Sequence, residues 1–319
     1  MEHQFICSQE LGDSFSGIYY VERFQIRLTT QSKEFTDMIL RDRSGSRPVK
    51  HWNKLDGISK GDFVFVAADV VEYMGYPSVV AKNVSREDSA PENVENYIPV
   101  CDDLDTHLEG FDSLRGRLDK VKDQTPSLLV GEVYKSSRFF ERFCSSPGSD
   151  RPHYGRHGGL VINIVRTTNA ACSLAAAAGF DDDEMSVLIA AGLVCRVGGI
   201  DAFDFHDCLP VVTARGTLLG VATLTMTRVT AALRRVLSEK PEDVDQDILL
   251  RILHAVNSHD GVATQPMTRE AIILHEAWKS DCLISESFEF MDTNRNGSDG
   301  FTAWDRHCSK RYYVGDVEE

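Results

Sequence analysis

The sequence has 319 residues, 42% apolar and 26% charged, which is typical of a globular protein with room for two domains. Its net charge of −15 argues against indiscriminate binding to phosphate backbones. The charge is uneven, because residues 1–90 carry about −2 and the remainder about −13. We therefore expect any nucleic-acid site to be a local patch in the N-terminal part.

Three further properties bear on where the protein resides. No run of about 18 apolar residues occurs, so we expect no membrane span and no membrane partner. The first residues lack the basic and apolar regions of a signal peptide. The eight cysteines show no Cys-x-x-Cys spacing, which favours reduced thiols over a disulfide framework. Together these properties predict a cytoplasmic protein.

The first 90 residues have the composition of a small β-barrel. Residues 15–28 mix β-branched and aromatic side chains with partial alternation. Four further strand-like segments follow, at residues 33–40, 47–52, 63–71 and 78–84. Residues rich in Gly, Asp and Ser separate them, as at Asp42–Ser46. Five short strands in about 75 residues predict a closed barrel such as an OB-fold.

The rest of the chain is dominated by helical periodicity. A polar linker at 85–100 precedes a helical stretch at 102–143, and a helix-rich block covers residues 159–291. We therefore predict an α+β chain, with a barrel followed by an all-α region. The predicted divisions are an OB-fold at 1–90, a linker and helical connector at 91–150, and a helical domain at 151–319.

The helical domain is organised around the apolar run Val187–Val194. Eight small and aliphatic residues in succession predict a helix that is buried on nearly all sides. The two residues that follow, Cys195 and Arg196, should therefore enter the core. Cys195 is expected to be a small core residue.

Several short motifs follow one another along the chain. They are Phe35–Gly45, Trp52, Lys60-Gly61-Asp62, Gly158–Val161, Gly216–Gly220, Asn257–Gly261 and Met267–Ala277. In order and spacing they resemble the YhaM-type 3′-to-5′ exoribonuclease family. The resemblance implies an OB-fold joined to an HD (His-Asp) metal-dependent phosphohydrolase domain. It also implies larger assemblies, so we expect self-association or protein partners.

The chain departs from this family at the positions of its metal ligands. The resemblance implies His and Asp ligands where this chain has Asn163, Cys195, Arg196, Val221 and Trp278. Asn is a weak ligand, Val and Trp are none, and a fixed Arg charge repels a divalent cation. We expect no cofactor and no catalytic residue, and we treat these five with His259 and Asp260 as a vestigial site. Should Mn²⁺ or Mg²⁺ bind, His259 and Asp260 are the candidate ligands.

Other metal arrangements are conceivable. The dipeptide His206-Asp207 is expected to be a solvated loop, and a relocated site would use some of His153, His157, His206, His259 and Asp260. Residues 292–299 resemble the start of an EF-hand loop, but Ala303 stands at the closing position, so we expect a polar turn.

Arg196 has two interpretations. It either pairs with a carboxylate or a helix end, or it binds a phosphate or a partner's acidic group where the metal would lie.

Five residues of the barrel are candidates for binding single-stranded nucleic acid. Aromatic rings can stack on bases and guanidinium groups can contact phosphates. We select Tyr20, Arg27, Arg43, Trp52 and Tyr73.

Three hypotheses about function follow. The first is a catalytically inactive relative of an HD-domain exonuclease that binds single-stranded RNA or DNA or acts as a scaffold. The second is an active metal-dependent 3′-to-5′ exonuclease or phosphohydrolase with a rearranged site. The third is a purely protein-binding structural subunit.

Overall fold

The structure is a computed structural model that describes residues 3–73, 76–89, 91, 94–101, 103–151, 153–206, 208–293, 300–305 and 308–315. The chain divides into two compact units. We call Met1–Val100, His206–Leu209 and Phe290–Glu319 the barrel unit, and Cys101–Phe205 with Pro210–Glu289 the helical unit.

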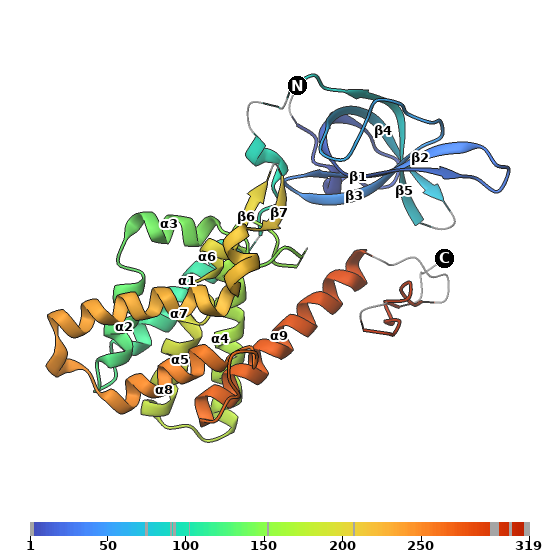
Figure 1. Ribbon diagram of the computed structural model, residues 1–319. Coiled ribbons are helices and arrows are strands. Elements are labelled where there is room, and N and C mark those ends of the chain that lie inside the picture. Colours follow the sequence, from blue (N-terminus) through green and yellow to red (C-terminus); the bar gives the residue numbers. More distant parts are fainter. Residues whose placement is uncertain are drawn as a thin grey trace. The chain divides into compact units, whose positions relative to one another are not determined.

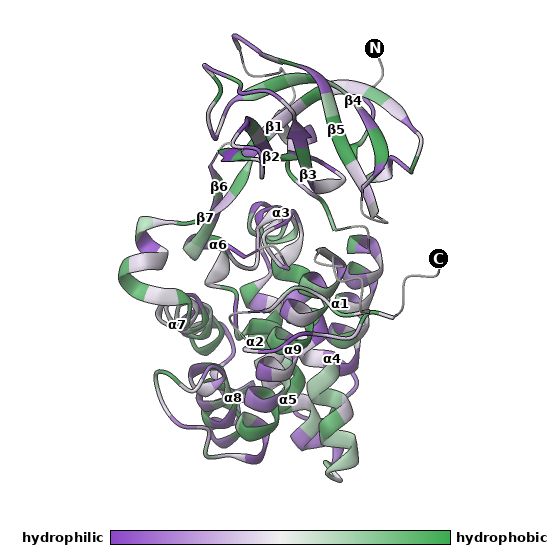
Figure 2. Ribbon diagram, turned by 90° about the vertical axis from the view of Figure 1, so that its right-hand side faces the viewer, coloured by the Kyte–Doolittle hydropathy of each residue, from purple (hydrophilic) through white to green (hydrophobic). Residues whose placement is uncertain are grey.

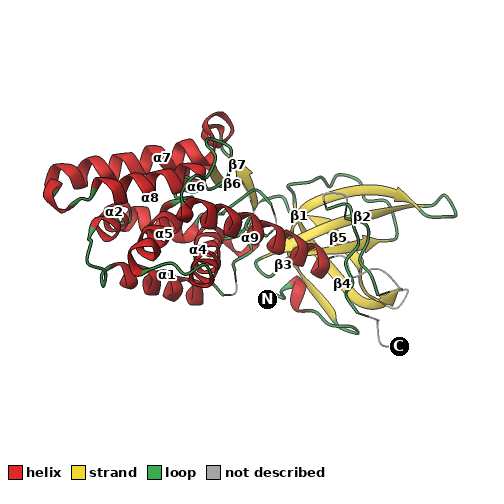
Figure 3. Cartoon of the chain, turned by 90° about the horizontal axis from the view of Figure 1, so that it is seen from below, coloured by secondary structure: helices red, strands yellow, loops and turns green. Residues whose placement is uncertain are grey.

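Five strands of the barrel unit close into a barrel (Figures 1 and 3). They are β1 (Ser14–Leu28), β2 (Glu34–Asp42), β3 (Gly45–His51), β4 (Phe63–Tyr73) and β5 (Tyr76–Arg86), preceded by η1 (Ile6–Ser8) and followed by η2 (Val94–Tyr97). Their order around the barrel is β1-β2-β3-β5-β4, and only the β3–β5 pairing is parallel. This closed five-stranded topology confirms the predicted OB-fold.

Side chains from alternating strand positions fill the barrel. Val21, Met38, Leu40, Val64 and Val66 are fully buried, as the period of two along each strand requires. The pairing register shifts once in β1–β2 and once in β4–β5. Such bulges bend a strand and so help a short sheet to close.

The second region is helical, which confirms the predicted α+β class. Its helices are α1 (Leu104–Leu118), α2 (Thr125–Val133), α3 (Ser137–Ser145), α4 (Gly159–Ala177), α5 (Asp182–Val194), α6 (Gly199–Ala202), α7 (Ala214–Glu239), α8 (Gln246–Ser258) and α9 (Arg269–Thr293), with η3 (Pro241–Asp243). A two-stranded sheet, β6 (Phe203–His206) and β7 (Leu209–Val212), interrupts them and was not anticipated. Helices α1–α3, which fall in the predicted connector, belong to the helical unit.

Helix α5 forms the centre of the helical unit. Asp181 and Glu184 form a reciprocal capping box that fixes its start. Every residue from Ser186 to Val194 is buried, which confirms the predicted all-round burial (Figure 2 colours apolar residues green). Helices α1, α2, α4 and α8 pack against it. The helix therefore delivers Cys195 and Arg196 to a fixed place.

By length and composition alone, three helical segments could cross a membrane, at Gly159–Ala177, Asp182–Ala202 and Ala214–Glu239. This finding corrects the expectation that no segment is apolar enough to span a membrane. The expectation required an unbroken apolar run, whereas a high mean hydropathy over a window is a less strict criterion. In the structure, 83% of the Asp182–Ala202 window is buried against the rest of the chain.

Candidate functional sites in the helical unit and on the barrel

The turn after α5 is held tightly against α7. A Cβ atom at Gly198 would lie 2.3 Å from the Thr225 nitrogen, so only glycine permits this approach. The Gly198 N–H donates to Thr225 Oγ1 at 3.0 Å. Helix α7 is broken at Gly220, whose φ of +72° is left-handed, and the carbonyl of the next residue, Val221, also faces Gly198. Val221 thus lies beside the turn.

Cys195 is an inert core residue, as expected. Its Sγ lies 3.2 Å from the Gly192 carbonyl oxygen, and its side chain is fully buried. Burial raises the pKa of the Cys195 thiol to about 12. A thiol held in its protonated form is neither a metal ligand nor a nucleophile.

Arg196 is half-buried above the ring of Trp278. Its guanidinium carbon lies 6.0 Å from the Trp278 ring centre, and Nη2 donates to the Gly148 carbonyl at 3.2 Å. Its Nε is buried and has no hydrogen-bond partner. Within the described part of the chain, no carboxylate lies within ion-pair distance of this guanidinium. The expected carboxylate partner is therefore not found there.

His259 also packs against Trp278. The two ring centres are 5.7 Å apart in an edge-on arrangement, and His259 is 1% exposed. Its Nδ1 is 2.8 Å from the Val256 carbonyl oxygen, which can only accept, so Nδ1 carries the proton and Nε2 presents a lone pair. Burial, together with the nearby Arg196 charge, lowers the pKa of His259 to about 4. The imidazole is therefore neutral at physiological pH.

Trp278 joins these two residues into one group. It stands on α9, and its Nε1 is buried without a partner, as is Nε2 of His259. We call Arg196, His259 and Trp278 the Trp278 cluster. Asp260 lies next to His259 in the chain, and its Oδ1 accepts from the Val262 N–H at 2.9 Å.

One turn further along α9, Asp281 gathers a set of donors that the sequence did not reveal. Its Oδ2 accepts from the Tyr154 hydroxyl at 2.6 Å and from Asn163 Nδ2 at 3.1 Å, and Arg166 forms an ion pair with Oδ1 at 3.2 Å. Asn163 Oδ1 is left without a partner. The only sequence signal for Asp281 was its place in the buried helical series Leu274, Ala277 and Asp281.

The residues at this place do not fit a divalent cation. Asn163 turns its nitrogen toward Asp281, Arg196 contributes a positive charge, and Val221 and Trp278 offer no ligand atom. Within the described ranges, no group of three or more His, Cys, Asp and Glu side chains has metal-binding geometry. We therefore propose no metal-dependent reaction at these residues.

Two of the remaining candidate ligands pack on aromatic rings. His153 packs on Tyr154 with ring centres 4.8 Å apart, and His157 stacks on Phe205 at 5.0 Å. His206 ends β6, while Asp207 lies outside the described residues, as do residues 294–299 of the EF-hand-like segment.

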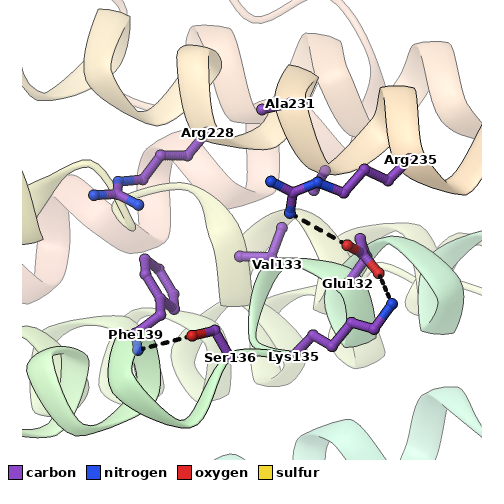
Figure 4. Close-up of a pocket in the computed structure, with 9 residues that line it drawn as sticks. Glu132, Val133, Lys135, Ser136, Phe139, Arg228, Ala231 and Arg235 are labelled. Atoms are coloured by element: carbon purple, nitrogen blue, oxygen red, sulfur yellow. Dashed lines mark hydrogen bonds and ion pairs between the residues drawn. The ribbon is translucent and has the colours of Figure 1, made fainter.

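A surface cavity of about 380 Å³ lies between α2, α3 and α7 (Figure 4). Its lining includes three cations, Lys135, Arg228 and Arg235. Lys135 and Arg235 both pair with Glu132, at 3.0 and 3.3 Å. Arg228 pairs with Asp201 at 2.6 Å. Because each cation already has a carboxylate, we assign no ligand to this cavity.

On the barrel, three aromatic rings form a continuous strip. The Trp52 ring centre lies 5.7 Å from that of Phe35 and 6.5 Å from that of Tyr73. Trp52 and Tyr73 are 42% and 45% exposed. Lys50 Nζ lies 4.6 Å from the Tyr73 ring centre, and Arg27 is the cross-strand partner of Phe35. We call Phe35, Trp52 and Tyr73 the aromatic strip.

The structure thus brings Trp52 and Tyr73 together and adds Phe35, which the sequence reasoning missed. Arg27 lies opposite Phe35 in the strand register, but its Nε pairs with Asp37 at 3.0 Å, so it is not a free cation of the strip. Tyr20 is only 2% exposed and packs edge-on against Phe63, so its ring cannot receive a base and we remove it from the proposed set. Arg43 is exposed but follows the far end of β2, about 25 Å along the strand from Phe35. It does not belong to the strip.

No family model matches the chain. The 3′-5′ exoribonuclease YhaM of Bacillus licheniformis is 22% identical over 293 residues, which cover 88% of each chain. The protein of the same name from Bacillus subtilis is 23% identical over 283 residues, 85% of each chain. The chain is a distant relative of the YhaM-type exoribonucleases.

This relationship to YhaM-type proteins extends over both units, and it confirms the resemblance carried by the motifs. Among solved structures, the second OB-fold domain of replication protein A from Methanococcus maripaludis is 18% identical and aligns with 28% of this chain and 99% of its own. The TM-score is 0.23, too low to add to what the strand order already establishes.

Proposed function

We propose that this protein binds single-stranded nucleic acid, and RNA in particular, through the aromatic strip, without cleaving it by a metal-dependent reaction. The strip carries the proposal, because partly exposed rings in a row with Lys50 beside them are suited to stacking on successive bases. The YhaM-type relatives are named for activity on RNA. The helical unit would act as a scaffold in the cytoplasm, with self-association or protein partners.

The non-catalytic part of the proposal is supported by the donor set around Trp278. Phosphodiester hydrolysis of the HD type needs cations that activate a water. Arg196 and Asn163 supply a positive charge and an amide nitrogen at the places where anionic or imidazole ligands are required. The runner-up function, a metal-dependent nuclease with a rearranged site, is favoured only by the names of the relatives.

Binding is tested by fluorescence anisotropy with a labelled single-stranded RNA of about 15 nucleotides, close to the largest site of one OB-fold. Trp52→Ala and Tyr73→Ala should each weaken binding about tenfold, because one base stack is lost. Phe288→Ala is the matched control, since it removes an exposed ring from α9 of the helical unit and should leave binding unchanged. No binding by the wild type at low salt, or an equal loss in the control, would contradict the proposal.

Cleavage is tested separately with Mn²⁺ on single-stranded RNA and DNA, alongside measurement of bound metal. We expect intact substrate and no stoichiometric metal. Cleavage that disappears in His259→Ala would establish the runner-up function instead.

A further inference from the structure

The Trp278 cluster leaves three buried polar atoms without partners in one place. They are Nε of Arg196, Nε2 of His259 and Nε1 of Trp278. A buried polar atom that lacks a hydrogen bond costs about 1–3 kcal/mol, so such atoms are rare in folded proteins. Three of them around one indole ring indicate a group that completes the set.

The chemistry of the three atoms defines that group. Arg196 Nε and Trp278 Nε1 each carry a hydrogen and can only donate. His259 Nε2 can only accept, because the ring proton lies on Nδ1 against the Val256 carbonyl. The completing group must therefore accept at least two hydrogen bonds and donate one.

Arg196, the one charged side chain of the cluster, favours an anion. Among the described residues, Arg196 donates a single hydrogen bond, to the neutral Gly148 carbonyl. Elsewhere in the same unit, Arg166, Arg228 and Arg251 all pair with buried or nearly buried carboxylates. A half-buried guanidinium without such a partner favours an anionic ligand, and guanidinium groups bind phosphate with charge-assisted hydrogen bonds.

We propose that the Trp278 cluster binds, without a metal, a phosphate group that retains one hydroxyl. Its unprotonated oxygens accept from Arg196 and Trp278, and its hydroxyl donates to His259. Arg196 and Trp278 are both half-buried, so part of the cluster reaches the surface of the helical unit. This site is separate from the aromatic strip and does not require that the barrel bind nucleic acid.

The ligand class can be tested by isothermal titration calorimetry of the full chain with EDTA present. Inorganic phosphate, sulfate and a nucleoside 5′-monophosphate are compared at equal ionic strength near neutral pH. Phosphate should bind at least about tenfold more tightly than sulfate, which has the same shape but no hydroxyl to donate. The nucleoside monophosphate distinguishes free phosphate from the phosphate end of a nucleotide. Its second phosphate pKa is about 6, so near neutral pH it has mostly lost the hydroxyl and should bind more weakly than inorganic phosphate. Tighter binding of the nucleotide would contradict the hydrogen bond to His259.

Three variants locate the binding. Arg196→Leu should abolish it, and Trp278→Phe, which keeps the ring but loses the N–H, should weaken it about tenfold. Lys279→Gln is the matched control, because it removes an exposed charge one residue from Trp278 and should bind as the wild type does. Circular dichroism checks the fold, and Trp278→Phe keeps the test decisive if Arg196→Leu does not fold.

Two results would overturn the proposal. One is the absence of phosphate binding at millimolar concentration, which would mean that water fills the cluster. The other is an equal loss of binding in Lys279→Gln and Arg196→Leu, each of which removes one positive charge, because this would mean a nonspecific response to charge.

Discussion

Two regions of the helical unit place an arginine over an aromatic ring, and they differ in what the arginine pairs with. Arg228 lies 4.9 Å from the Phe139 ring centre beside the cavity and is bound to Asp201. Arg196 lies 6.0 Å from the Trp278 ring centre and has only a carbonyl contact. The first arrangement is complete within the protein. The second leaves hydrogen-bonding capacity unused, and this distinction, rather than the presence of positive charge, marks a candidate binding site.

The largest expected effect concerns Asp281, which lies one turn along α9 from Trp278. Asp281→Ala should lower the free energy of unfolding by about 3–4 kcal/mol, because Tyr154, Asn163 and Arg166 lose a buried anionic acceptor. Urea unfolding measures this loss. Asp247→Ala, an exposed position on α8, is the control and should change stability little. A similar loss in both variants would show that Asp281 has no special structural role.

The pH dependence of stability should depend on His259. Its folded pKa of about 4 lies below the ordinary value of 6.5, so between these pH values the unfolded chain binds the extra proton. Stability is therefore fully present above pH 6.5 and falls as the pH drops toward 4, by at most about 3 kcal/mol.

Urea unfolding at pH 7 and pH 5 tests this, with His259→Gln expected to show a smaller loss. His153, whose pKa is also lowered by burial, contributes equally in both proteins. Identical pH profiles for the two proteins would refute the role of His259.

The contrast between the two arginines predicts stability changes of opposite sign. Arg228→Leu should destabilise by about 1–2 kcal/mol, since it leaves the nearly buried Asp201 with only the exposed Arg215. Arg196→Leu should be neutral or stabilise by about 1 kcal/mol in phosphate-free buffer, because it removes an unsatisfied buried atom. Thermal unfolding of both variants provides the comparison. A loss of stability in Arg196→Leu similar to that in Arg228→Leu would mean that the two regions are alike.

The smallest expected effect tests whether the capping box at the start of α5 affects phosphate binding by Arg196, which follows the end of the helix. Asp181→Ala removes the capping box and should destabilise the unit by about 1 kcal/mol. Phosphate binding should not change, because the buried segment up to Val194 stays in place. Weaker binding in this variant would show that α5 does not hold Arg196 independently of its first turn.

Structural elements whose sequence has a fixed local period could be predicted from the sequence. The alternation in residues 15–84 indicated a closed barrel, and the unbroken apolar run Val187–Val194 indicated a helix buried on all sides. The prediction for Tyr20 did not hold, because an aromatic residue in a strand has the same sequence signature whether it faces inward or outward. Only strand pairing revealed that Phe35, and not Tyr20, lies beside Trp52.

The sequence by itself determined that the residue types at the candidate site, such as Asn163 and Arg196, do not suit a divalent cation. It could not determine what each of them contacts, because Asn163, Arg196, His259 and Asp281 come from four separate helical segments. Tertiary packing alone decided that Asp281 takes the hydrogen bond of Asn163 and that Arg196 has no carboxylate within reach among the described residues. The physical reason is that hydrogen-bond satisfaction depends on distances of about 3 Å between chain segments far apart in sequence.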